Sequence, residues 1–104
     1  MEKNKNSQKM KIEIDDKTIE GNYANFAIVT HSIAEFILDF VRVLPGAIKH
    51  KVKSRIIISP VHAKTFCKAL QENIRKFEKK YGEIKIVNQN VETSFKLPKD
   101  KLPN

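Results

Sequence analysis

Residues 55–81 read RIIISPVHAKTFCKALQENIRKFEKKY, a β-branched run followed by a long segment with helical periodicity. The two parts meet at Ser59 and Pro60, where serine suits a helix N-cap and proline suits the first helical position. The sequence therefore predicts a strand over residues 55–58 and an amphipathic helix from Pro60 to about Tyr81. Its apolar positions are Ala63, Phe66, Cys67, Leu70, Ile74, Phe77 and Tyr81.

Other segments show the two-residue alternation of half-buried strands. Residues 11–15 alternate in this way and predict a first strand. Only a short segment separates residues 23–30 from residues 35–43, so these two segments predict a hairpin. Residues 83–87 alternate again and predict a last edge strand. The fold class that follows is α+β, with a mainly antiparallel sheet of about four strands and one long C-terminal amphipathic helix packed on it.

The length of 104 residues fits a single domain. We expect residues 1–10 to form a disordered lead-in, residues 11–87 the α+β domain, and residues 88–104 a flexible tail. Cys67 has no second cysteine to pair with. Neither a secretory signal nor an apolar run long enough to cross a bilayer is apparent, so we expect a cytoplasmic protein without a membrane partner.

No motif in the chain is typical of an enzyme or a metal site. The three glycines stand singly, which argues against a glycine-rich phosphate loop, and no spacing of Cys or His matches a metal site. Cys67 falls among the apolar helix positions and is expected to be a buried thiol. Asp39 is expected to form a cross-strand ion pair with Arg42 or Arg55. These features predict a non-catalytic protein that uses no cofactor and no metal.

Several short sequence motifs occur in a fixed order along residues 22–84. They are Tyr23-Ala24-Asn25, His31-Ser32, Glu35-Phe36, Leu38-Asp39-Phe40, Ser54-Arg55-Ile56, Ser59-Pro60, His62-Ala63-Lys64, Ala69-Leu70 and Asn73-Ile74. In this order they resemble the prokaryotic domain of unknown function 3467 family. That family has no established activity, so the resemblance implies a small prokaryotic domain and no catalytic residues. The path from strands to a long helix is also faintly similar to the SecB export chaperone, which implies a chaperone-like role.

Two kinds of binding remain open. The first is a protein-binding or assembly module, a homo-oligomer with a dimer favoured, whose further protein partner is unknown. Residues 23–30 and 35–43 are apolar on both faces, and the helix needs only one of them. A second subunit or an extended client would cover the other face, unless the N-terminal strand and the tail cover it within the chain. The predicted interface residues on that face are Ile37, Val41 and Val43.

The alternative is binding of single-stranded nucleic acid. The formal net charge is +8, and a basic loop leads into the strand at residues 55–58. The predicted contact residues are Lys49, Lys51, Lys53 and Arg55. Aromatic residues on the strands would supply stacking faces for bases, namely Tyr23, Phe26, Phe36 and Phe40.

Overall fold

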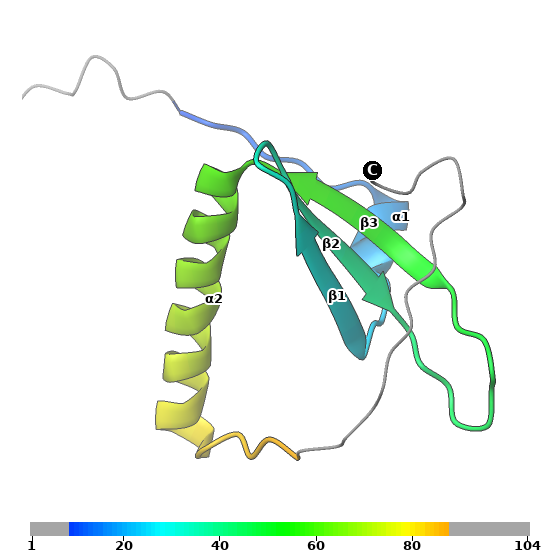
Figure 1. Ribbon diagram of the computed structural model, residues 1–104. Coiled ribbons are helices and arrows are strands. Elements are labelled where there is room, and N and C mark those ends of the chain that lie inside the picture. Colours follow the sequence, from blue (N-terminus) through cyan, green and yellow to red (C-terminus); the bar gives the residue numbers. More distant parts are fainter. Residues whose placement is uncertain (1–8, 88–104) are drawn as a thin grey trace, which may run out of the picture. The chain divides into compact units, whose positions relative to one another are not determined.

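The computed structural model describes residues 9–87 and has an α+β fold (Figure 1). In chain order its elements are α1 (Asp16–Glu20), β1 (Phe26–His31), β2 (Phe36–Val41), β3 (Val52–Ile58) and α2 (Pro60–Tyr81). The chain divides into two units, one ending at Lys68 and one beginning at Ala69. The predicted lead-in and tail lie outside the described residues, except for residues 9 and 10.

The sheet has three antiparallel strands in the order β1-β2-β3, so β2 is central and β1 and β3 are edges. The predicted hairpin is present, because β1 and β2 pair from Phe26 opposite Val41 to His31 opposite Phe36. Ser32 closes its turn, accepting at its Oγ from the N–H groups of Ala34 and Glu35 at 3.2 Å. A bulge interrupts the pairing of β2 with β3 between Phe40 and Val41.

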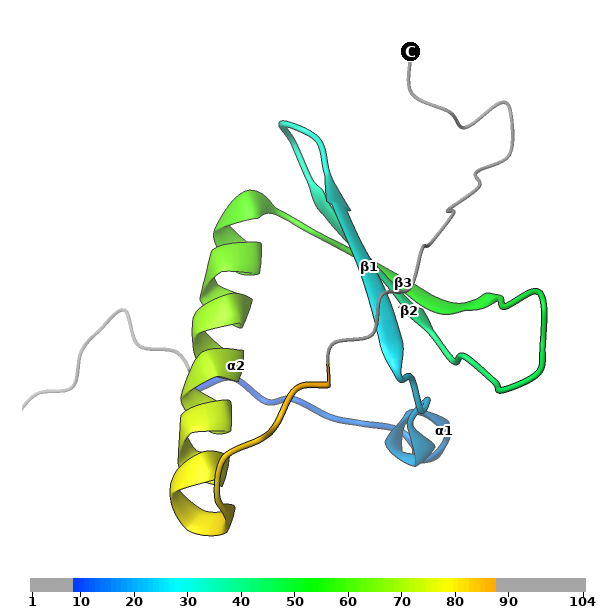
Figure 2. The same ribbon diagram turned by 60° about the horizontal axis from the view of Figure 1, so that its bottom comes forward.

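The prediction of about four strands is wrong for the described part of the chain. Residues 11–15 and 83–87 alternate as strands do, yet neither segment joins the sheet. Alternation shows that a segment suits a strand, but a strand also needs a partner edge, which a local pattern does not supply. Residues 11–15 run instead into α1, and Figure 2 shows this segment and α1 (blue) apart from the three strands.

Helix α1 was not expected, since the sequence pattern predicted a strand over residues 11–15 and no helix before Pro60. The sequence feature that begins this helix is the N-cap residue Asp15, whose Oδ1 accepts from the N–H of Thr18 at 2.7 Å. Hydrogen bonding by Thr18, through its side chain and then its backbone, lowers the pKa of the Asp15 carboxyl. Gly21 ends the helix with a positive φ of 76°.

Helix α2 begins at Pro60 and ends at Tyr81, which confirms the predicted helix. Ser59 is its N-cap, because Ser59 Oγ accepts from the N–H of His62 at 3.2 Å and lies 2.8 Å from His62 Nδ1. At the other end Gly82 has a φ of 104° and its N–H donates to the carbonyl of Glu78. Neither helix of the described region is long and apolar enough to cross a membrane.

The described residues bury very little. Val41, at 6% exposure, is the one hydrophobic residue among them that is buried, and Asp39, at 0%, is the one buried polar residue. No residue of α2 is buried. Cys67 is exposed in the structure, where a buried thiol was expected.

Candidate functional site

One face of the sheet is almost entirely apolar. The register places Leu38 of β2 between Val29 of β1 and Ile56 of β3, so their side chains share a face. We call this the apolar sheet face, and its apolar members are Ala27, Val29, Phe36, Leu38, Phe40, Ile56 and Ile58, while His31 and Ser54 are the polar residues on it. Val29 and Ile56 are exposed, at 59% and 47%, although both are β-branched residues in the middle of strands. A surface of this composition is typical of a protein contact site.

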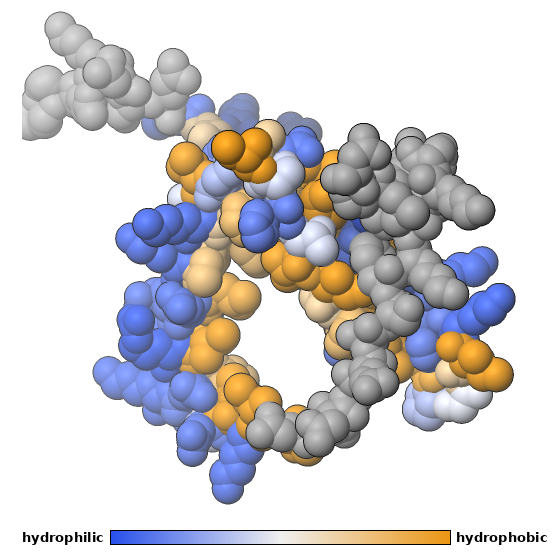
Figure 3. Space-filling model, in the orientation of Figure 1, coloured by the Kyte–Doolittle hydropathy of each residue, from blue (hydrophilic) through white to orange (hydrophobic). Residues whose placement is uncertain are grey.

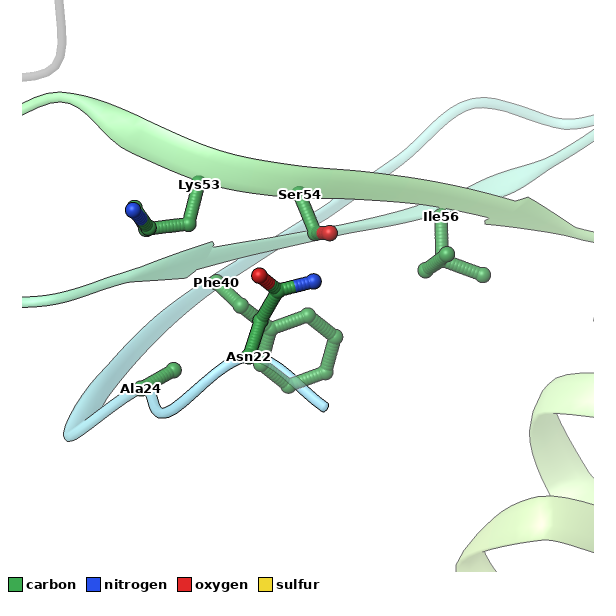
Figure 4. Close-up of a pocket in the computed structure, with 6 residues that line it drawn as sticks. All are labelled: Asn22, Ala24, Phe40, Lys53, Ser54 and Ile56. Carbon is green, nitrogen blue, oxygen red and sulfur yellow. The ribbon is translucent and has the colours of Figure 1, made fainter. Parts of the chain in front are cut away.

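A shallow hollow of about 300 Å³ lies at one end of the apolar sheet face. Figure 4 shows the Phe40 ring, the Asn22 amide and the Ser54 hydroxyl directed toward the same space, with Lys53 and Ile56 at its border. The hollow is open to solvent and offers a few polar groups beside an apolar floor. It therefore suits an inserted side chain better than an enclosed small molecule.

The opposite face carries an ion pair at its centre. Asp39 and Arg55 are directly opposite each other on β2 and β3, which confirms the predicted partner Arg55 and not Arg42. Arg55 Nε donates to Asp39 Oδ1 at 2.7 Å and its Nη2 donates to Oδ2 at 2.9 Å. This bidentate hydrogen bonding raises the pKa of the Arg55 guanidinium. The side chain of Asp39 is fully buried, whereas that of Arg55 is 43% exposed.

The predicted protein-interface residues belong to this second face or follow it. Ile37 is half-buried and Val41 is buried within the single chain, so neither presents a large free surface. Val43 lies after β2 and is more accessible, and its backbone N–H donates to Asn25 Oδ1 at 2.7 Å while its carbonyl accepts from Asn25 Nδ2 at 3.0 Å. Ile57 of this second face is 53% exposed, and Val29 and Ile56 are exposed on the apolar sheet face. Sequence reasoning missed the apolar sheet face because residues 26–29 are apolar on both sides, so alternation alone does not show which side is covered.

The predicted nucleic-acid residues are only partly brought together. Lys49 and Lys51 are exposed in the loop between β2 and β3. Lys53 is exposed within β3 and lines the hollow beside Phe40. Arg55 is held by Asp39, so its guanidinium has fewer donors free for a phosphate.

Helix α2 has a continuous apolar side. Figure 3 shows its hydrophilic residues (blue) along one side and its hydrophobic residues (orange) along the other. We call the seven apolar positions predicted from the sequence the helix stripe. All of its large members are exposed, including Phe66 and Leu70 in its middle, and the rings of Phe77 and Tyr81 lie 4.9 Å apart at its end. The periodicity predicted this stripe, and the structure confirms the helix that carries it.

Within residues 9–87 no group of three or more His, Cys, Asp or Glu side chains is placed to hold a metal ion. The features that stand out are instead two apolar surfaces, one on a three-stranded sheet and one on a helix of 22 residues. They define a small α+β domain whose sheet and helix each carry an apolar surface.

The chain belongs to the family described as "Protein of unknown function (DUF3467)", which it matches over residues 1–86. This confirms the family resemblance noted from the sequence. Comparison with curated proteins and with solved structures finds no match, so the resemblance to the SecB export chaperone is not confirmed.

Proposed function

We propose that the protein is a non-catalytic, homo-oligomeric protein-binding or assembly module, most simply a dimer. The observation that carries the proposal is the amount of apolar side chain on the sheet face and the helix stripe, since Val41 is the one buried hydrophobic residue among the described residues. Burying a single Leu, Ile or Phe side chain contributes roughly 1.5–3 kcal/mol. A second protein surface that covers the apolar sheet face and the helix stripe would therefore bury many such side chains and stabilise the assembly.

The proposal includes the expectation from the sequence that the helix packs on a sheet. A chaperone-like role fits the same surfaces, because an extended client segment would contact the apolar sheet face in the way a subunit does. We place the assembly in the cytoplasm, since an unpaired thiol on a contact surface suits a reducing compartment.

Two measurements together test this function, namely the mass of the protein in solution and the reactivity of the Cys67 thiol. Cys67 is the one cysteine of the sequence and lies on the helix stripe, so a thiol reagent reports on this surface alone. We expect light scattering to give a multiple of the 12.0 kDa chain mass, and Cys67 to react slowly at high protein concentration and faster on dilution. A helix that packs only within its own chain would protect Cys67 equally at every concentration. A monomeric mass with a reactive thiol at tens of micromolar would contradict the proposal.

The second candidate function is binding of single-stranded nucleic acid. What favours it is the position of Lys53, which lines a hollow together with an aromatic ring of the sheet and lies on the strand that follows Lys49 and Lys51. A cation beside a stacking face is the usual combination for sequence-tolerant binding of single strands.

We expect the variant with Lys49, Lys51 and Lys53 all changed to alanine to bind a labelled single-stranded oligonucleotide more weakly if this function is real. Its slope of log affinity against log salt should also flatten by about 2 to 3, since each lost phosphate contact removes roughly one unit. Arg55 is left unchanged because it is paired with Asp39. The matched control changes Lys64, Lys68 and Lys79 of α2 to alanine and removes the same charge. An equal loss of affinity in both variants would show that the binding depends on net charge and not on these three lysines.

A further inference from the structure

Residues 11–15, which we call the N-terminal arm, form a strand-like segment that lacks a strand partner within the described chain. Lys11, Glu13 and Asp15 alternate with Ile12 and Ile14. Both isoleucines are exposed, at 83% and 59%, and the arm ends where Asp15 caps α1. An exposed pair of isoleucines with two-residue spacing is unfavourable in water and is typical of a segment that completes a sheet elsewhere.

The outer edge of β3 is open in the part of the chain that the structure describes. β3 is an edge strand of seven residues, and its end carries three consecutive isoleucines. Proteins usually blunt such an edge with proline, charge or cover, because its free N–H and C=O groups pair readily with another strand. β3 carries Lys53 and Arg55, but Ile56 and Ile57 beyond them are both exposed.

We propose that the N-terminal arm of one copy pairs with the β3 edge of a second copy and adds a fourth strand to its sheet. The inference rests on the proposed homo-oligomer and specifies one of its contacts. Exchange between two copies would satisfy both β3 edges and cover both arms by the same symmetric contact. It would also account for the fourth strand that the sequence pattern predicts and that the described single chain lacks.

Side-chain chemistry selects β3 and fixes which way the arm faces. When Ile12 and Ile14 extend the apolar sheet face beside Ile56, the charged residues of the arm lie on the opposite face, where Arg55 lies. The guanidinium of Arg55 is 43% exposed, so the Glu13 carboxylate can approach it from the added strand. The other edge, β1, has the sequence FAIVTH and offers no Lys or Arg to the acids of the arm.

Disulfide trapping between two differently labelled chains tests this contact. Cys67 is changed to serine in both chains, one chain carries Ile12→Cys or Ile14→Cys together with a mass tag, and the other carries Ile56→Cys. Directly opposite residues of adjacent strands bring their Cβ atoms within about 4.5–5.5 Å, near the range a disulfide needs. After the chains are refolded together and mildly oxidised, we expect a product that contains one tagged and one untagged chain. The control replaces Ile56→Cys by Val29→Cys, which lies on the same face but on the β1 edge.

The outcomes separate this inference from the function on which it rests. Trapping with Ile56→Cys, and little with Val29→Cys, supports the exchange. Preferential trapping at Val29, or no trapping while light scattering still shows an oligomer, overturns the exchange and leaves the assembly intact. An internal disulfide at single-chain mass in a chain carrying both Ile14→Cys and Ile56→Cys also overturns it. A monomeric mass for the unmodified protein overturns the assembly itself.

Discussion

Replacing Arg55 by methionine is expected to lower the melting temperature by about 10 °C or more, because it leaves a fully buried carboxylate without its cation. Asp39 would lose both of its bidentate hydrogen bonds while its side chain stays at 0% exposure. Methionine keeps most of the aliphatic stem, so the change removes the charge with little loss of packing. Thermal unfolding followed by circular dichroism at pH 7 and fixed protein concentration measures the effect.

Two controls separate this effect from a general loss of charge. Arg75→Met breaks the exposed ion pair with Glu72, whose side chains are 67% and 50% exposed, and should shift the melting temperature by no more than about 2 °C. The double variant Asp39→Leu with Arg55→Met removes both charges and should recover most of the lost stability. If Arg55→Met melts like the unmodified protein, the buried pair does not hold the sheet together.

Leu70→Glu is expected to weaken self-association by at least about 100-fold, because burying an unpaired carboxylate costs several kcal/mol and each 1.4 kcal/mol is a factor of ten in affinity. Leu70 lies in the middle of the helix stripe, and its side chain is 49% exposed. Sedimentation velocity over a dilution series gives the dissociation constant.

Gln71→Glu is the matched control for this variant. It introduces the same charge one residue further along α2, at an exposed position outside the helix stripe. The control should associate like the unmodified protein, and both variants should keep their helix content. Equal dissociation constants for the two variants would show that the helix stripe is not part of the contact between subunits.

The parts of the fold that the sequence predicted well are those that local chemistry determines. Both ends of α2 agree with the prediction, because Ser59 and Gly82 act on the nearest turn of the helix and need no distant contact. The β1–β2 hairpin was found for the same reason, although both strands are shorter than predicted. β3 is longer and begins at Val52, so Lys53 belongs to a strand and not to the loop.

The parts that the sequence did not predict depend on which surfaces meet. Residues 11–15 have the alternation of a strand but find no partner edge in the described chain. Cys67 has the neighbours of a buried thiol and is nevertheless exposed, since periodicity identifies an apolar side of a helix without identifying what covers it. The apolar sheet face was not predicted for a similar reason. Val29 and Ile28 are equally apolar, and only the register shows which face each one occupies.

The pairing of Asp39 with Arg55 also determines which of several alignments the sheet adopts. Sliding β3 past β2 by two residues would keep every side chain on its face, and the isoleucines at the end of β3 would pack against β2 almost as well as they do now. In that alignment Asp39 would face Ile57, or the irregular backbone near Lys53, and its buried carboxylate would lose its bidentate partner. The ion pair therefore disfavours a misaligned hairpin that hydrophobicity alone would tolerate, which gives a sheet with so few buried residues one alignment instead of several.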